Sequence, residues 1–167
     1  GFHSLRRFNA LFRERYRLAP TQLRRAAPPT SNDGLTLAMD YRPPYAWDAI
    51  LGFFRMRAVP GVEQVMNDSY SRIVRINAGA GETLGWIEVR HLPERSQLLL
   101  TIDPGLRRVL APLLAGVRRQ FDLDCDPQRI NVALGELAAR EPGLRLPGSI
   151  DSFEQAVRAI LGQQVSV

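Results

Sequence analysis

The residues of this sequence that could do chemistry are few and widely spaced. His3 and His91 stand far apart, and neither lies in a metal-ligand pattern such as HExxH. Cys125 is the single cysteine, which excludes an internal disulfide framework and a cysteine-rich zinc site within these residues. We expect both histidines to be surface or groove residues. We expect Cys125 to be a small residue near a helix start, with a reactive thiol as the alternative.

Carboxylates and glycines cluster at three places, and each cluster has a structural interpretation. Asp122, Asp124 and Asp126 lack the longer, glycine-centred spacing of a calcium loop, and Asp126 is also placed to cap a helix. Asp151 and Glu154 have the spacing of a capping box. The stretch NAGAGE separates two strand-like segments and indicates a hairpin turn rather than a phosphate-binding loop. None of these three clusters therefore has the spacing of a conventional catalytic or metal-binding motif.

The charge of the chain raises the possibility of a nucleic-acid partner. Among 167 residues, 22 are basic and 17 acidic, and every basic residue is arginine, whose planar fork suits phosphates and base edges. An arginine-rich solvated surface is the alternative. No apolar run approaches the roughly 20 residues that span a bilayer, and the amino terminus lacks the apolar core of a signal peptide. We expect a cytoplasmic protein without a membrane partner.

The elements that position these residues divide the chain into four parts. Residues 1–25 are strongly basic, residues 26–34 are a linker of turn formers, residues 35–148 form the main domain, and residues 149–167 begin another. Ser4 can cap a helix that runs to about Arg15, and a break at Pro20 precedes a short second helix. The first helix has apolar residues on one face: Leu5, Phe8, Leu11 and Phe12.

The main domain is predicted to combine an antiparallel sheet with helices. Strand-like segments lie at 35–41, 62–66, 70–77, 83–91 and 97–102, separated by turn formers at hairpin distances. The stretch AWDAILGFFRMRA predicts a helix whose buried side carries Trp47, Ile50, Leu51 and Phe54.

Three further helices are predicted after the last strand. Asp103 and Pro104 start one with a long apolar face, kinked at Pro112, with its arginines largely off that face. Asp126 and Pro127 start a second. Asp151 starts the third. The apolar residues of the second are Ile130, Leu134 and Leu137, and we expect a core on the third from Val157, Ile160 and Leu161.

The amino-terminal pattern GF..L.RFN.LFRERYRLAPTQLRR resembles the end of the DNA-binding domain of the AraC/XylS family. That resemblance implies a helix-turn-helix remnant in which Gly1 and Phe2 belong to the turn, and the helix that follows, from Ser4, enters the major groove of promoter DNA. It places five residues against base edges or phosphates: His3, Ser4, Arg6, Arg7 and Asn9. The alternative is a basic amphipathic helix packed on a neighbouring element.

Three later stretches, YRPPYAWDAILGFFRMRAVPGVEQV, FDLDCDPQRINVALGELA and PGLRLPGSIDSFEQAVRAILGQQVSV, resemble the AlkA-type DNA-3-methyladenine glycosylases over roughly residues 35–167. The resemblance implies an α+β fold, a small antiparallel sheet flanked by helices like half of a TATA-binding protein. It makes the last helix the start of a truncated helix-hairpin-helix domain. The two resemblances in this order are similar to Ada–AlkA fusions of the bacterial adaptive response. In those fusions a zinc-binding methyl acceptor lies upstream, and none of it is present here.

The glycosylase resemblance implies double-stranded DNA with alkylated bases as the partner. Phe53 matches an aromatic of the base pocket, with a core position as its alternative. Gln163 matches a pocket position, and Gln164 matches the residue that wedges into the duplex, where the best-known form is apolar. An interface with the main domain, or plain helix surface, is the alternative for both glutamines.

The same resemblance places the catalytic aspartate beyond residue 167. We therefore expect the parent protein to hydrolyse N-glycosidic bonds in base excision repair, and this chain alone to be inactive, without a cofactor. The alternative is a transcriptional regulator whose glycosylase-like region is a non-catalytic binding module.

Overall fold

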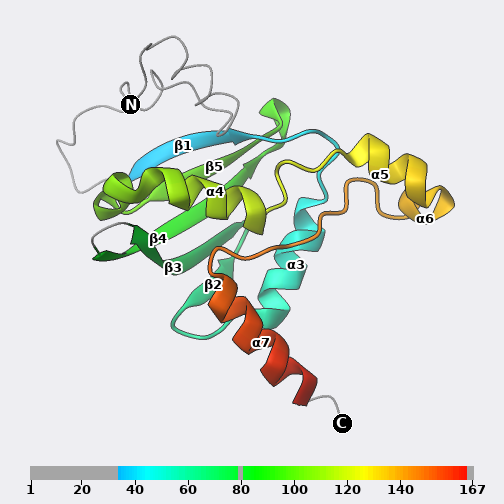
Figure 1. The fold of residues 1–167 in the computed structure, drawn as a ribbon. Helices are drawn as coiled ribbons and strands as arrows, with labels where there is room; N and C mark the ends of the chain where they lie inside the picture. The colour runs from blue at the N-terminus through cyan, green and yellow to red at the C-terminus, as the bar shows by residue number, and fades with distance from the viewer. Residues whose placement is uncertain (1–33, 79–80, 165–167) are drawn as a thin grey trace, which may run out of the picture.

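The centre of the structure, a computed structural model that describes residues 34–78 and 81–164, is a five-stranded antiparallel sheet (Figure 1). Its spatial order is β1-β5-β4-β3-β2. The strands are β1 (Leu35–Asp40), β2 (Glu63–Met66), β3 (Ser69–Ala78), β4 (Gly81–Leu92) and β5 (Gln97–Ile102). A 3₁₀ turn, η1 (Pro93–Arg95), joins the last two. The predicted strands and the antiparallel sheet are confirmed.

Period-two alternation explains why these segments form the sheet. In β5, Leu98, Leu100 and Ile102 are buried, and the residues between them are partly exposed. Met39 and Leu37 of β1 are the cross-strand partners of Leu98 and Leu100, so the buried sides coincide. β3 and β4 pair up to Ala78 and Gly81, which confirms a hairpin at NAGAGE. The buried residues of β1 and β5 therefore lie on one covered face of the sheet.

Helices α3 (Trp47–Arg57) and α4 (Leu110–Gln120) supply the other half of the core. The predicted buried side of α3 is confirmed: Trp47, Ile50, Leu51 and Phe54. The Phe121 ring, just after α4, lies 5.3 Å from the Phe54 ring and 5.7 Å from the Tyr70 ring, measured between centroids. Aromatic contacts at such distances join both helices to β3.

The segment after β5 differs from the predicted kinked helix. A 3₁₀ helix, η2 (Pro104–Val109), comes first, capped by the Asp103 side chain, and α4 begins only at Leu110. Pro112 then falls in the first turn of α4, where a backbone N–H has no intrahelical partner, so proline needs no kink. Arg118 was expected off the apolar face, but it is buried and bonds to Asp124 at 3.1 Å.

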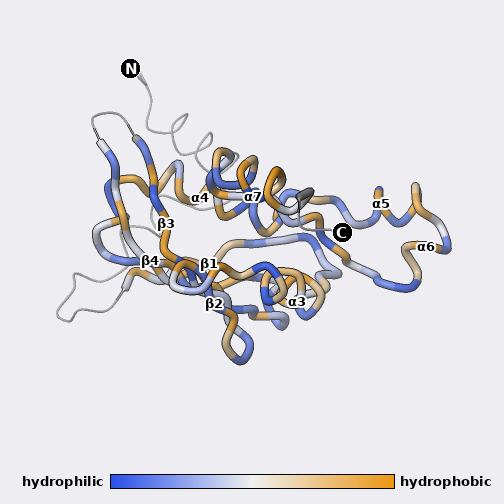
Figure 2. The backbone as a smooth tube through the Cα atoms, turned by 90° about the horizontal axis from the view of Figure 1, so that it is seen from below, coloured by the Kyte–Doolittle hydropathy of each residue, from blue (hydrophilic) through white to orange (hydrophobic). Residues whose placement is uncertain are grey.

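The predicted helix after Asp126 is split in two. The Asp126 side chain caps α5 (Pro127–Leu134) as expected, but Gly135 has φ 54° and separates it from α6 (Glu136–Ala139). These helices lie to one side of the sheet (Figure 1), and apolar and polar stretches alternate along them (Figure 2). Ile130, Leu134 and Leu137 are exposed. Their side chains lack a neighbouring layer in the described part of the chain.

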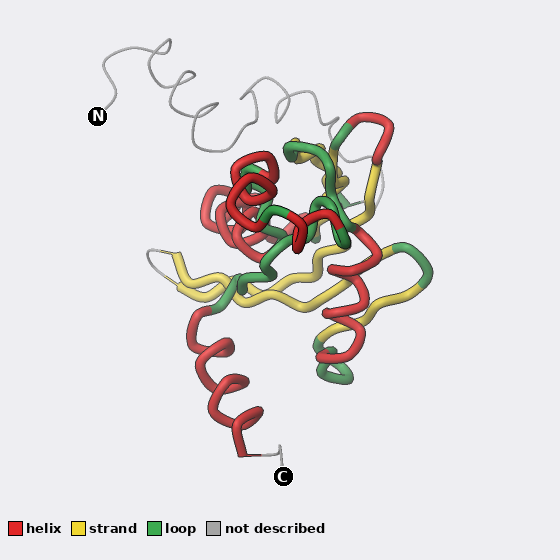
Figure 3. The backbone as a smooth tube through the Cα atoms, turned by 90° about the vertical axis from the view of Figure 1, so that its right-hand side faces the viewer, coloured by secondary structure: helices red, strands yellow, loops and turns green. Residues whose placement is uncertain are grey.

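The last helix, α7 (Ser152–Gln164), extends away from the sheet (Figure 3). Asp151 caps it, because its Oδ1 atom accepts from the backbone N–H of Phe153 at 2.9 Å and of Glu154 at 3.2 Å. The expected core of α7 is wrong: Val157, Ile160 and Leu161 are 38%, 62% and 60% exposed. The apolar stripe exists, but the helix contacts the sheet through charged side chains instead. No helix in the described ranges is long and apolar enough to cross a bilayer.

Candidate functional site

A cavity of about 420 Å³ lies where α7 meets α3 and the sheet. Phe53 and Arg57 of α3 form one side, and Gln120, at the end of α4, lies on another. The wall from α7 and the preceding loop contains Gly148, Ser149, Glu154, Gln155, Arg158, Ala159, Leu161 and Gly162. The cavity is therefore built from segments about a hundred residues apart in the sequence.

Two adjacent phenylalanines of α3 take different places at this cavity. Phe54 is buried with Tyr70, at 4.7 Å between ring centroids. Phe53 is half-buried and lines the cavity, since neighbouring helical residues point about 100° apart. The Arg57 guanidinium carbon lies 4.0 Å from the Phe53 ring centroid and covers one face of that ring. Phe54 is thus the core member of the pair, and the pocket role of Phe53 stays a prediction.

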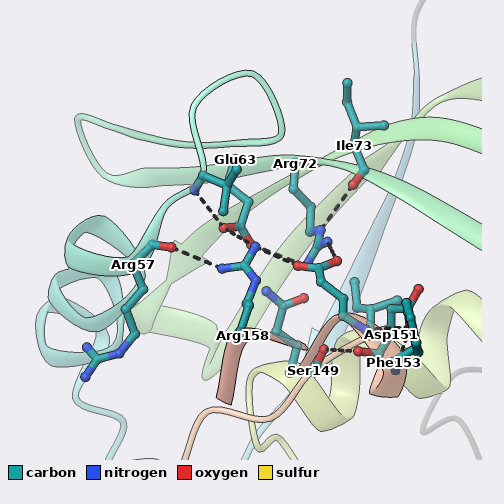
Figure 4. Close-up of polar contacts among 12 residues, drawn as sticks. Arg57, Glu63, Arg72, Ile73, Ser149, Asp151, Phe153 and Arg158 are labelled. Carbon is teal, nitrogen blue, oxygen red and sulfur yellow. Dashed lines mark hydrogen bonds and ion pairs between the residues drawn. The ribbon is translucent and has the colours of Figure 1, made fainter. Parts of the chain in front are cut away.

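Four charged residues, the charge ring, form the polar wall of the cavity (Figure 4). Its members are Glu63 of β2, Arg72 of β3, and Glu154 and Arg158 of α7. The Arg72 Nη2 atom lies 2.7 Å from Glu154 Oε2, and Arg158 Nη2 lies 2.9 Å from Glu63 Oε2. Within the sheet, Arg72 Nη1 lies 3.3 Å from Glu63 Oε1. Within α7, Arg158 Nη2 lies 2.6 Å from Glu154 Oε1. Two positive and two negative charges balance locally.

A buried hydrogen-bond chain continues the charge ring into the core. The Tyr70 hydroxyl donates to Glu63 Oε1 at 2.8 Å, and Gln120 Nε2 donates to that hydroxyl at 2.8 Å. Because Tyr70 has one proton and gives it to Glu63, its oxygen is the acceptor for Gln120. Gln120 Oε1 is then left buried without a hydrogen-bond partner among the described residues.

The electrostatics of the site favour the charged form of Glu63. Burial alone would raise the pKa of this carboxyl group, but hydrogen bonds from Tyr70 and Arg158, with the charge of Arg72, hold it below its ordinary value. Burial raises the pKa of the Tyr70 hydroxyl, which keeps it a donor. The site therefore holds an ionised Glu63 and a neutral Tyr70 at neutral pH.

The charge ring was not singled out in the sequence, although one signal was present. Arg72 alternates with Tyr70 and Val74, so it occupies a core-facing position of β3. A charge at such a position requires a partner, which predicts a buried carboxylate nearby. Glu154 was interpreted as half of a capping box, but its carboxylate bonds to Arg72 and Arg158.

The remaining candidate residues lie elsewhere. His91 is in a separate aromatic cluster, where its Nε2 atom lies 2.7 Å from the Tyr41 hydroxyl. Burial raises the pKa of the Cys125 thiol, which opposes a reactive thiolate. The described residues contain no group of histidine, cysteine and carboxylate side chains able to hold a metal ion. The predicted reader residues, His3 to Asn9, lie outside the described part. Gln163 and Gln164 end α7, and their side chains also lie outside it.

The chain matches a known protein-domain family. Residues 36–151 match the AlkA N-terminal domain. The chain belongs to this family. The match ends at Asp151, the cap of α7, so the cavity lies between the AlkA N-terminal domain and the helix that follows it.

Two relatives of this chain have names that describe a function. "DNA-3-methyladenine glycosylase 2" of Escherichia coli (strain K12) is 46% identical over 129 residues, which cover 77% of this chain and 44% of that protein. "Probable bifunctional transcriptional activator/DNA repair enzyme AlkA" of Mycobacterium tuberculosis (strain ATCC 25618 / H37Rv) is 35% identical over 178 aligned positions, 99% of this chain and 35% of that protein. The chain spans less than half the length of these two relatives. Their names indicate a family of DNA-repair glycosylases.

Proposed function

We propose that this chain is part of a bacterial, cytoplasmic DNA glycosylase that excises alkylated bases of the 3-methyladenine type by hydrolysing the N-glycosidic bond. One observation carries the proposal: Phe53 presents a half-exposed aromatic ring to a cavity between the AlkA N-terminal domain and α7. A relative named DNA-3-methyladenine glycosylase 2 supports the choice of substrate. DNA that contains alkylated bases is the proposed partner.

The chemistry of the substrate fits an aromatic wall. A glycosylase rotates the damaged nucleotide out of the stack, and alkylation at N3 of adenine leaves that base cationic. A cationic base on an aromatic face gains about 0.5–2 kcal/mol. Arg57 already covers one face of Phe53, so the base stacks on the other face or displaces the guanidinium.

The remaining parts of the proposed site are divided between α7 and the region that would follow. We assign Gln163 to the pocket and Gln164 to the duplex wedge, on the resemblance alone. No residue of this chain is assigned a catalytic role and no cofactor is proposed, because the resemblance places the aspartate beyond Val167. A site that lacks its charge-stabilising group typically loses about 10²–10³ in rate, so this chain by itself should be inactive.

The test is release of 3-methyladenine from methylated duplex DNA by this chain and by the longer protein that contains it. In the longer protein, Phe53→Ala should lower kcat/KM about 2- to 30-fold, the equivalent of the cation–π contribution. Phe153→Ala on α7 is the matched control, since this side chain is exposed and does not line the cavity. Unchanged excision by Phe53→Ala, with an unfolding cost of about 3–5 kcal/mol, would make Phe53 a core residue.

We also propose that residues 1–25 are the end of a helix-turn-helix reader fused to the glycosylase. The name of the Mycobacterium tuberculosis relative, which joins a transcriptional activator to a repair enzyme, supports this fusion. Arg6→Ala with Arg7→Ala should flatten the salt dependence of binding to promoter DNA, because fewer counterions are released. An unchanged slope of affinity against salt rules the reader out.

A second function deserves a test because of the same relative's name: a transcriptional regulator with a non-catalytic glycosylase-like module. The two differ in one measurement. Base release by the longer protein supports the enzyme, and operator binding without any base release supports the regulator.

A further inference from the structure

The charge ring combines two ion pairs of matching size. Glu63 and Arg72 are direct cross-strand partners on β2 and β3, a relation that places their side chains about 5 Å apart. Glu154 and Arg158 are four residues apart on α7, which gives a spacing of about 5–6 Å on the helix surface. A helical pair and a cross-strand pair of equal spacing can therefore meet in one arrangement, charge against opposite charge.

The contacts between the two pairs follow that arrangement. Each residue of the helix pair bonds to the opposite charge of the sheet pair, Arg72 to Glu154 and Glu63 to Arg158, so the sign alternates around the ring. The sheet pair is deeply buried, with side chains 5% and 6% exposed, and the helix pair is about 29% exposed. A displaced or reversed helix would set like charges together or leave Arg72 and Glu63 without their outer partners, and both outcomes cost free energy.

Apolar packing does little to fix the position of α7 along the sheet. Its apolar side chains are largely exposed, so sliding the helix changes the buried area little. The second polar anchor is Arg158 Nη1, which donates to the Arg57 carbonyl at 3.0 Å. Arg57 is the last residue of α3, where carbonyls lack intrahelical partners. One arginine thus ties α7 both to the sheet and to the helix that carries Phe53.

We propose that the charge ring is a register lock: Glu63, Arg72, Glu154 and Arg158 are positioning residues that set where α7, and with it Gln163 and Gln164, lies relative to Phe53. The effect on excision rests on the proposed function, whereas the effect on α7 does not. A shift of one helical turn would move the end of α7 by about 5.4 Å. A misplacement of about 1 Å can already cost 10²-fold in rate.

The test reverses each pair in the longer protein and measures amide hydrogen exchange of α7. Glu154→Arg with Arg158→Glu should speed this exchange at least about 10-fold and lower kcat about 10- to 100-fold, with KM less affected. Adding Glu63→Arg with Arg72→Glu should slow the exchange again and recover part of kcat, because the ring regains alternating signs. The control is the exposed diagonal ion pair between β3 and β4, reversed as Arg75→Glu with Glu82→Arg, which should change neither quantity.

Hydrogen exchange of α7 and the rate of base excision distinguish failure of the register lock from failure of the proposed function. Unchanged α7 exchange in the helix reversal, or no recovery in the quadruple variant, overturns the lock. If the sheet reversal prevents folding, Glu154→Gln with Arg158→Gln decides instead, since it leaves the buried pair intact: faster α7 exchange supports the lock, and normal exchange overturns it. Altered exchange with unchanged excision overturns the positioning role. An unmodified protein without glycosylase activity overturns the proposed function, while the exchange data still test the lock.

Discussion

The sheet region, β1–β5 with α3 and α4, and the helices α5–α7 have the same kind of sequence pattern and opposite outcomes. Leu113 and Leu114 of α4 are fully buried, whereas Leu137 of α6 and Ile160 of α7 are mostly exposed. Both sets recur at helical spacing. An amphipathic pattern therefore predicts a face but not its burial, because burial requires a second layer in reach.

The helix starts show no such difference. Asp103, which caps η2 in the sheet region, and Asp126 and Asp151, which cap α5 and α7, all accept backbone N–H bonds as expected. A cap depends on residues within one turn, so it forms wherever the helix lies. Helix caps thus depend on local residues, whereas burial depends on contacts distant in the sequence. The following substitutions test this difference, in order of decreasing effect.

The largest expected difference is between two phenylalanines. Phe54→Ala should lower the free energy of unfolding by about 3–5 kcal/mol, because it empties a site among Tyr70 and Phe121 in the core. Phe153→Ala on α7, where the side chain is 75% exposed, should change it by less than about 0.5 kcal/mol. Urea unfolding of both variants measures the contrast, and equal losses would mean that α7 is packed.

The contact between the sheet region and α7, which includes Glu63, should be less stable at low pH. The pKa of Glu63 is lower in the fold than its ordinary value of 4.5, so its ionised form stabilises the fold above that pH. This contribution is lost as pH falls through the lowered pKa. Glu63→Gln should cost about 1.5–3 kcal/mol at pH 7 and progressively less below pH 4.5. A pH-independent cost, measured by denaturant unfolding from pH 3 to pH 7, contradicts the assigned charge state.

The caps should respond alike in both regions. Asp103→Ala and Asp126→Ala each remove a side-chain acceptor at a helix start, and each should cost its own helix about 1 kcal/mol. Hydrogen exchange of the first turns reports the two helices separately. A cap that matters in the sheet region alone would show that α5 is not an independently formed helix.

The smallest effect is expected for the exposed apolar residues. In this chain Leu137→Ala should change the free energy of unfolding by less than about 0.5 kcal/mol, whereas the buried Leu114→Ala should cost about 2–5 kcal/mol. Repeating Leu137→Ala in the longer protein sharpens the comparison. A cost that rises there shows that further chain covers α6.

At the candidate site, the family resemblance proposed Phe53 for the base pocket, but it did not single out the polar groups that surround Phe53. The 100° between adjacent helical residues separates Phe53 from Phe54, and helical spacing from Ile50 and Leu51 predicts Phe54 as the buried member of the pair. The contacts of Phe54 with Tyr70 and Phe121 confirm it. The carboxylate partners of Arg72 come from β2 and from a helix some eighty residues later, and no local pattern joins them.

The sequence by itself determined the five strands, the antiparallel sheet, the buried side of α3 and the three caps, because period-two alternation, helical spacing and capping act within a few residues. Only the tertiary structure decided that Arg118 is buried, that the stripes of α5–α7 are exposed, and that Glu154 serves an ion pair. Those outcomes depend on which elements become neighbours in space. A charge such as Arg72 can be buried only where the fold brings opposite charges to it.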